Sequence, residues 1–220
     1  MRRGCWLAPG AFALAMAVAL GGCASPPREP RNLSALKAEL REYHRSGAYL
    51  ADIAAVCREA EGWISRRTLA GGRLAVVVDL DESLWSNWPY FEAQDFGYVP
   101  GAWARWVEEA RAPALAPVAD LVRTLPARGV AVVFLTARPE RERAATLRNL
   151  RAIGLAEGAR LFCQPDGDWR VNAAFKADVR AELQAEGWVL IANLGDQESD
   201  LAGGGAERSF KLPNPFYRTD

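Results

Sequence analysis

Histidine and net charge are what this 220-residue sequence has least of. His44 is the only histidine, and nothing on its predicted helix marks it as a ligand, so we interpret it as structural or exposed. The 27 basic residues balance 27 acidic ones, which leaves no net field to draw the chain onto nucleic acid. The sequence has no internal repeat and no long run of charge. We therefore expect a small-molecule partner, no nucleic acid, and a single domain.

The hydrophobic run near the start, from Ala11 to Leu20, is too short to span a bilayer. It follows Arg2 and Arg3, and a basic start before a short apolar run is typical of an export signal. The run ends in Leu20-Gly21-Gly22-Cys23, which resembles a bacterial lipoprotein box. That resemblance implies a signal peptide over residues 1–22 and a lipid on Cys23, so a Cys23→Ser variant should lose its membrane attachment. The alternative is a plain secretory signal that ends beside a cysteine.

The next segment, residues 23–32, is rich in proline and is predicted to be an extended tether, followed by a folded domain over residues 33–220. Ala24, not an aspartate, follows Cys23. The lipoprotein resemblance therefore implies a lipid anchor in the outer membrane that faces the periplasm.

Few cysteines remain after this processing. Cys5 would leave with the signal and Cys23 would carry lipid, so only Cys57 and Cys163 could hold free thiols. An exported compartment would allow these two to pair, but each is explained equally well as a small buried hydrophobe. The sequence leaves both alternatives open.

Hydrophobic patterning predicts alternating strands and helices. The run Leu74 to Val78 has no polar alternation, which is typical of a parallel strand that is covered on both faces. Further strands are predicted at residues 130–135, 160–163, 188–194 and 209–212. Apolar residues at intervals of three and four predict helices over residues 33–69, with a break near Gly47, and over residues 117–125, 140–153 and 175–183.

An aromatic-rich insert, residues 84–113, follows the first strand. It is a candidate cap whose rings cover a pocket and stack on an organic group. The alternative is a hydrophobic cluster that only holds the insert together, and we favour this for most of the rings.

Three of the predicted strands end in polar side chains. The first ends in Asp79 and Asp81, the second in Thr136, and the fourth in Asp196 and Asp200. A doubly wound parallel sheet, an α/β architecture of the Rossmann type, would bring these ends to one edge. Carboxylates about 4 Å apart repel by about 4 kcal/mol per pair at an effective dielectric near 20, so a bound cation would relieve the site. Oxygen ligands alone favour a hard ion such as Mg²⁺.

The motifs at these strand ends resemble those of the haloacid dehalogenase-like phosphohydrolases. The likeness is to the class B and C acid phosphatases, including bacterial lipoprotein acid phosphatases, plant acid phosphatases and vegetative storage proteins. The matching segments are Asp79-Leu80-Asp81-Glu82-Ser83-Leu84, Leu135-Thr136-Ala137-Arg138, Lys176 with Arg180, Gly195-Asp196-Gln197-Glu198-Ser199-Asp200-Leu201, and Ser209-Phe210-Lys211-Leu212-Pro213-Asn214-Pro215. Ser83 and Ala137 depart from the usual Thr and Gly or Asn, but neither change removes a reacting group.

This resemblance implies a Mg²⁺-dependent acid phosphatase that hydrolyses phosphomonoesters through an aspartyl-phosphate intermediate. Asp79 would be the nucleophile, and Asp81 would protonate the leaving alcohol and later activate water. The implied phosphate-binding residues are Thr136, Lys176 and Arg138. The implied metal site comprises Asp79, Asp81 through its main-chain carbonyl, Asp196, and Asp200, which tunes the site from close by.

The alternatives are a binding or storage protein of the same fold with little catalysis, and a phosphotransferase or nucleotidase. Retention of Asp79 argues against the first, whereas the same residues would support the second. With one histidine, neither a phosphohistidine mechanism nor a histidine-rich binuclear centre can be built. The substrate is predicted only as a small phosphomonoester, with nucleoside monophosphates among the candidates, and the oligomeric state cannot be derived.

Overall fold

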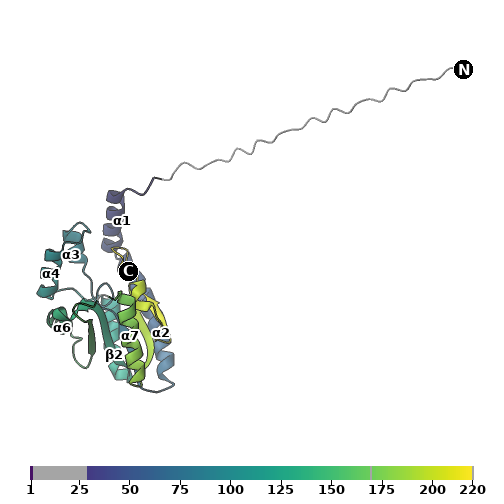
Figure 1. Ribbon diagram of the computed structural model, residues 1–220, viewed down its shortest axis with the longest axis vertical. Coiled ribbons are helices and arrows are strands. Elements are labelled where there is room, and N and C mark those ends of the chain that lie inside the picture. Colours follow the sequence, from purple (N-terminus) through teal and green to yellow (C-terminus); the bar gives the residue numbers. More distant parts are fainter. Residues whose placement is uncertain (2–28, 169, 220) are drawn as a thin grey trace. The chain divides into compact units, whose positions relative to one another are not determined.

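The computed structural model of the protein describes residues 1, 29–168 and 170–219 (Figure 1). Leu33–Asp220 form one compact unit. The predicted export signal, with Cys5 and Cys23, lies outside the described residues, so the lipid anchor stays a prediction. In the part of the chain that is described, no helix combines the length and the apolar character that a membrane span requires.

The described residues contain a sheet of five parallel strands in the order β3-β2-β1-β4-β5. The strands are β1 (Leu74–Val78), β2 (Ala131–Pro139), β3 (Arg160–Gln164), β4 (Val189–Gly195) and β5 (Ser209–Lys211). All five residues of the central strand β1 are buried, which explains its unbroken apolar run. The predicted doubly wound parallel sheet is confirmed.

Alternate residues of β1 point into two separate cores, one on each face of the sheet. Val76 and Val78 belong to the core that includes buried residues of α2 (Ala48–Thr68) and α5 (Ala116–Thr124). Ala75 and Val77 belong to the core of α7 (Asn172–Ala185). Full burial of a valine side chain contributes about 1.5–3 kcal/mol. Helices on both faces therefore fix β1, and with it the position of the acidic segment that follows.

The other helices are α1 (Leu33–Arg45), α3 (Trp88–Ala93), α4 (Pro100–Glu109), α6 (Arg143–Ala152) and α8 (Glu198–Leu201), with short 3₁₀ turns at Pro126–Arg128 and Glu140–Glu142. The predicted break between the first two helices is confirmed at Gly47, whose φ of 82° is easily adopted only without a Cβ. The prediction of one helix over residues 140–153 differs slightly, because a 3₁₀ turn precedes α6.

Two irregularities shape the strands next to the site. In β4 the pairing with β1 shifts at Ile191, whose carbonyl accepts a hydrogen bond from the Trp63 indole (2.7 Å). In β2 the strand continues beyond the predicted end at residue 135, and its register with β3 shifts between Thr136 and Pro139. Bulges of this kind bend a strand and redirect its side chains.

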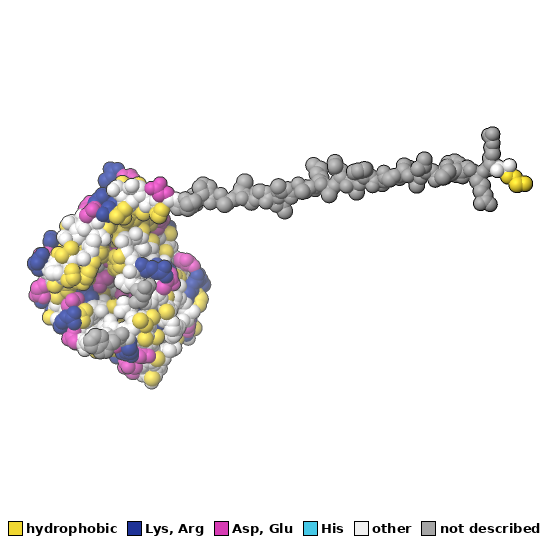
Figure 2. All heavy atoms as spheres, turned by 45° about the horizontal axis from the view of Figure 1, so that its top comes forward, with side chains coloured by type: hydrophobic (Ala, Val, Ile, Leu, Met, Phe, Trp, Pro, Cys, Tyr) yellow, Lys and Arg dark blue, Asp and Glu magenta, His cyan; other side chains and the backbone are white. Residues whose placement is uncertain are grey.

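The aromatic insert, residues 84–113, contains α3 and α4. The buried rings among its aromatic residues are Trp85, Trp88, Tyr90, Phe91 and Trp106. Tyr98 is exposed. On the face of the molecule shown in Figure 2, basic and acidic side chains are interspersed, in keeping with the balanced composition.

Of the cysteines that the structure describes, Cys57 and Cys163 are both buried and unpaired. Each therefore serves as a small core residue, the second of the two alternatives.

Candidate active site

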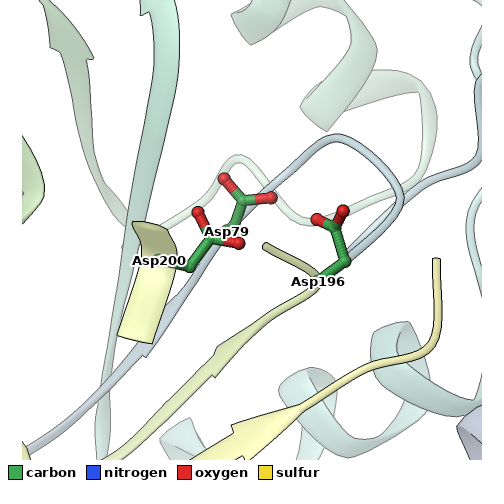
Figure 3. A group of neighbouring side chains, drawn as sticks. All are labelled: Asp79, Asp196 and Asp200. Carbon is green, nitrogen blue, oxygen red and sulfur yellow. The ribbon is translucent and has the colours of Figure 1, made fainter. Parts of the chain in front are cut away.

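Three carboxylates meet where the two central strands end (Figure 3). Asp79 follows β1 and Asp196 follows β4, while Asp200 lies on α8, one turn beyond. Each offers an oxygen within 4.8 Å of the others, and all three residues are buried. The Asp79 amide donates to the Leu194 carbonyl (2.9 Å), which continues the β1–β4 ladder and fixes the Asp79 backbone.

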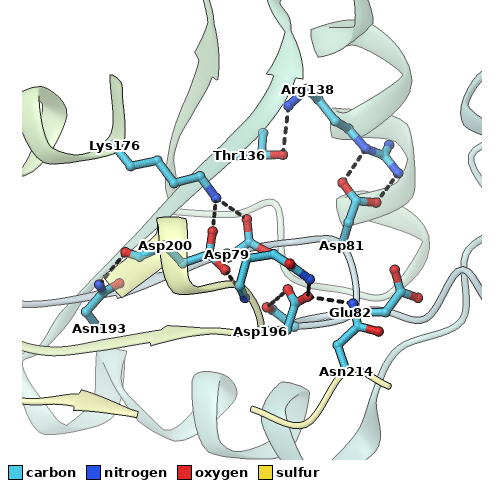
Figure 4. Close-up of polar contacts among 12 residues, drawn as sticks. Asp79, Asp81, Glu82, Thr136, Arg138, Lys176, Asn193, Asp196, Asp200 and Asn214 are labelled. Atoms are coloured by element: carbon cyan, nitrogen blue, oxygen red, sulfur yellow. Dashed lines mark hydrogen bonds and ion pairs between the residues drawn. The ribbon is translucent and has the colours of Figure 1, made fainter. Parts of the chain in front are cut away.

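Lys176 reaches this group from the first half of α7 (Figure 4). Its Nζ lies 2.5 Å from Asp79 Oδ1 and 2.5 Å from Asp200 Oδ1, and its side chain is buried. Burial alone would lower the pKa of Lys176, but the two carboxylates outweigh it and raise that pKa. The lysine is therefore a fixed positive charge beside Asp79.

One ammonium does not balance three buried carboxylates. Burial raises the pKa of Asp79 well above its usual value, and the nearby Asp200 carboxylate adds to this. Burial and Asp200 likewise raise the pKa of Asp196, against the hydrogen bonds that this carboxylate accepts. A hard divalent cation fits this donor set, because its ligands would all be oxygens and its charge would relieve the repulsion.

Asp81 lies in a different environment from the three-carboxylate group. Arg138 clamps its carboxylate through two nitrogens, Nη2 to Oδ1 (2.6 Å) and Nε to Oδ2 (2.9 Å). The Trp85 indole (2.9 Å) and the Asn87 amide (2.8 Å) also donate to Oδ1. Burial opposes ionisation of Asp81, but the Arg138 charge and these hydrogen bonds outweigh it and lower the pKa. Asp79 and Asp81 therefore differ in pKa although only one residue separates them.

Two features fix the segment from Gly195 through α8, which carries Asp200. A Cβ on Gly195 would lie 2.3 Å from the Asp200 Cβ, so only glycine leaves room for this carboxylate. Arg180 is fully buried and donates to the carbonyls of Asp200 (2.8 Å) and Gly204 (2.6 Å), and also to that of Ala202. Arg180 thus supports the backbone around Asp200 and does not point at a ligand. Its buried guanidinium needs hydrogen-bond acceptors, and these three carbonyls supply them.

Sequence reasoning missed a group of residues behind Asp81. Glu82 has a left-handed backbone (φ 53°) and is fully buried, and it accepts hydrogen bonds from Tyr217 Oη (2.9 Å) and from the Asn87 side chain (2.9 Å). Burial, with the nearby Asp81 charge, raises the pKa of Glu82 to about 8. Asn214 donates to Asp196 Oδ2 (2.8 Å). Two features of the sequence could have indicated these residues. Glu82 directly follows Asp81, and Asn214 lies between two prolines.

A cavity of about 560 Å³ opens over these groups. The site residues in its wall are Asp79, Asp81, Thr136, Arg138, Lys176, Asp196 and Asp200, and its aromatic residues are Phe91, Phe96, Tyr98, Trp103 and Tyr217. The insert and the C-terminal segment therefore border the same space as the strand ends.

The comparison with known families decides what kind of site this is. A model of the HAD (haloacid dehalogenase-like) superfamily, subfamily IIIB (acid phosphatase), matches residues 29–220. The chain belongs to this acid phosphatase family. It is therefore a phosphomonoester hydrolase by family, and the resemblance of its motifs is confirmed.

Individual relatives of this acid phosphatase agree with the family. It is 34% identical to Acid phosphatase 1 of Solanum lycopersicum over 184 residues. This match covers 81% of this chain and 72% of that protein. It is 32% identical to Vegetative storage protein 1 of Arabidopsis thaliana over 64% of this chain and 54% of that protein. The class C acid phosphatase from Bacillus anthracis shares the fold, with a TM-score of 0.68 and 22% identity over 83% of this chain and 86% of that one.

Within this acid phosphatase, the predicted residues form two groups. Lys176 joins the three-carboxylate group, and Arg138 joins Asp81. The Thr136 hydroxyl accepts a hydrogen bond from the Arg138 backbone amide (3.1 Å), and Thr136 lies in the cavity wall. In Figure 4 it lies between Lys176 and Arg138. Ser83, which departs from the usual threonine, keeps a hydroxyl that donates to Asp196 Oδ1 (2.8 Å). The individual roles of these residues stay predictions.

Proposed function

We propose that the protein is a Mg²⁺-dependent acid phosphatase that hydrolyses phosphomonoesters through an aspartyl phosphate on Asp79. The observation that carries this proposal is the environment of Asp79. Its carboxylate lies 2.5 Å from the Lys176 ammonium, beside Asp196 and Asp200, in the wall of a cavity. A carboxylate can attack a phosphate dianion only where positive charge offsets their repulsion.

The residues that would hold the cation are Asp79, Asp196 and Asp200, with the Asp81 main-chain carbonyl as a further oxygen. Mg²⁺, when bound, would supply the positive charge that brings phosphate oxygens and the Asp79 carboxylate together. Asp79 would then form a bond to phosphorus while the ester bond to the leaving alcohol breaks. Lys176 and the Thr136 hydroxyl would donate to the phosphoryl oxygens during this transfer.

Asp81 would give its proton to the leaving alcohol and then take a proton from the hydrolytic water. The Asp81 carboxylate is clamped by Arg138, whose charge lowers the pKa of Asp81 against the effect of burial. We infer that a substrate phosphate competes for the Arg138 guanidinium. That exchange would remove the charge that holds Asp81 ionised, and it would let Arg138 bind the phosphate, the role implied by the family motif.

Two other functions within the family use the same residues. Transfer of the phosphoryl group to an alcohol in place of water needs no change in the site. A storage function is favoured by the 32% identity to Vegetative storage protein 1 of Arabidopsis thaliana. Against it stand the retained Asp79 and its contact with Lys176, because a storage protein has no need of a buried, charge-compensated nucleophile.

The test is a screen of phosphomonoesters, including nucleoside monophosphates, with Mg²⁺ and with a chelator. We expect turnover that requires the metal and that Asp79→Asn abolishes on every substrate, because an amide cannot form an acyl phosphate. Asp120→Asn is the matched control, since that side chain is exposed and pairs with Arg123 on the same helix, α5. Full turnover by Asp79→Asn, or turnover that resists the chelator, would contradict the proposal. A free alcohol in the assay would divert phosphate from water if transfer competes.

A further inference from the structure

In the first helix of the compact unit, α1, all of whose residues the structure describes, no side chain is fully buried. The helix nevertheless contacts the aromatic insert along one face, where Lys37, Arg41 and His44 lie at positions i, i+4 and i+7. Lys37 Nζ lies 2.6 Å from Asp95 Oδ2, and Arg41 Nη2 lies 2.9 Å from Asp95 Oδ1. His44 stacks on Trp88, with ring centroids 3.9 Å apart. One carboxylate of the insert thus holds two cations of α1.

The segment that carries this carboxylate is a strained turn. Asp95 and the next residue, Phe96, both have a left-handed backbone, with φ of 50° and 63°. Aspartate tolerates this conformation, but a bulky side chain adopts it rarely. The Phe96 amide donates to the Phe91 carbonyl (2.7 Å) at the end of α3. Such a backbone persists only where the surroundings fix it from several sides, and strained turns of this kind are concentrated at ligand sites.

The ring of Phe96 connects α1 to the substrate cavity. It lines the cavity that also contains Asp79 and Asp81. From behind, the Arg41 guanidinium lies 5.2 Å from its centroid, and the Trp88 ring meets it edge-on at 5.6 Å. Rotation of the turn would move this ring out of the wall. The contacts that prevent rotation come from α1 and from α3.

We propose that Asp95 is a positioning residue for substrate: by binding Lys37 and Arg41, it holds the strained turn so that Phe96 forms part of the wall that packs on the organic group of the phosphomonoester. The inference rests on the proposed function, since it requires this cavity to take the leaving group. It makes α1 a specificity element although no α1 residue lines the cavity.

The size of the effect follows from the exposure of the ion pairs. The Asp95 side chain is 64% exposed and that of Arg41 is 41% exposed, so each pair is weak by itself. Loss of both should loosen the turn and not unfold it. We therefore expect a change of several-fold in the binding of a bulky substrate and almost none in the chemical step.

The experiment compares Asp95→Asn with the unaltered protein on 4-nitrophenyl phosphate and on methyl phosphate, each with Mg²⁺. Asparagine keeps the size and the tolerance of a left-handed backbone but removes the charge. We expect KM for the aryl substrate to rise about three- to tenfold, with kcat changed less than twofold. Both constants for methyl phosphate should stay within about twofold, because a methyl group offers no ring to pack on the Phe96 side chain. Each variant is compared with the unaltered protein on the same substrate, so the intrinsic difference between leaving groups cancels.

Two further variants make the test specific. Glu42→Gln is the matched control, because it removes the Arg45 pair on the same helix without touching the insert, and it should leave every constant unchanged. A combined Lys37→Met and Arg41→Met variant should raise KM for the aryl substrate at least as much as Asp95→Asn does, because it also removes the Arg41 guanidinium from the Phe96 ring. Adding Asp95→Asn to that variant should change KM little further.

The outcomes separate this inference from the proposed function. Turnover with the same KM in Asp95→Asn as in the unaltered protein would overturn the inference alone. An equal rise of KM on both substrates would also overturn it, since the effect would then not act through the wall. No turnover of either substrate by the unaltered protein would overturn the proposed function and this inference with it.

Discussion

Gly195 leaves the space that Asp200 occupies. Because a Cβ at this position would approach the Asp200 Cβ to 2.3 Å, Gly195→Ala must push the carboxylate or the strand end aside. Shifts in the residues that orient metal ligands typically cost about 10- to 100-fold in metal affinity. We expect the Mg²⁺ concentration that gives half-maximal activity to rise by this factor, as measured by metal titration.

Gly62→Ala provides the matched control for this substitution. Gly62 lies inside α2, and the nearest atom to an added Cβ is the flexible end of Arg66, at 3.6 Å. Alanine there should stabilise the protein by about 0.4–1 kcal/mol, because it reduces the freedom of the unfolded chain. The Mg²⁺ requirement should not change. If Gly195→Ala activated at the same Mg²⁺ concentration as the Gly62→Ala control, Asp200 would not belong to the metal site.

At the scale of elements, the contact of α1 with the insert should weaken in acid. Burial against Trp88 lowers the pKa of His44 below its usual value of about 6.5, and the Glu92 charge opposes this shift only in part. The packed state therefore favours neutral imidazole, and the undocked helix binds more protons as the pH falls. The stabilisation from His44 is fully present above about pH 6.5 and is lost as the pH falls through the lowered pKa.

Hydrogen exchange of the amides in residues 33–45 measures this docking directly. At pH 7.5 the unaltered protein should exchange more slowly than a His44→Gln variant, and at pH 5 the difference should shrink. Comparing the two proteins at the same pH removes the intrinsic effect of pH on exchange. A difference of constant size between pH 7.5 and pH 5 would mean that protonation of His44 does not control the docking of α1.

The same scale shows what the sequence can predict. Strands such as β1 are buried on both faces, so an unbroken apolar run marks where each strand lies and where it ends. Asp79 and Asp196 are the next residues in the chain after β1 and β4, so they could be predicted. The direction of a side chain beyond such an end is not fixed by pattern. The extension of β2 to Pro139, with its shift in register, sends Arg138 to Asp81, a contact between residues 57 positions apart. No local sequence pattern predicts an ion pair between residues so far apart in the chain.

For the whole molecule, the site needs residues that are distant in the chain. Tyr217 contacts Glu82 across 135 positions, and Lys37 contacts Asp95 across 58. Contacts between residues so far apart in the chain leave no trace in local hydrophobic patterning, so the C-terminal segment and α1 could not be assigned to the site from their own patterns. The Cys23 anchor belongs to a part of the chain outside the described residues, and it stays a prediction of the lipoprotein-like box.

The central claim is that Asp79 receives the phosphoryl group while Asp81 serves as the acid and base. It predicts opposite defects in single-turnover reactions, where formation of the phosphoenzyme is followed separately from its hydrolysis. Asp79→Asn should form no phosphoenzyme with any substrate. Asp81→Asn should form it at nearly the normal rate from an aryl phosphate but about 10² to 10⁴ times more slowly from an alkyl phosphate, because only the alkyl alcohol needs a proton to leave.

The most direct measurement is therefore the site of labelling in Asp81→Asn. We expect the acyl phosphate to accumulate during turnover of an aryl phosphate, because the variant lacks the base that activates water, and mass spectrometry should locate it on Asp79. Phosphate on any other residue, or turnover of the aryl phosphate with no covalent phosphate on the protein, would contradict the account.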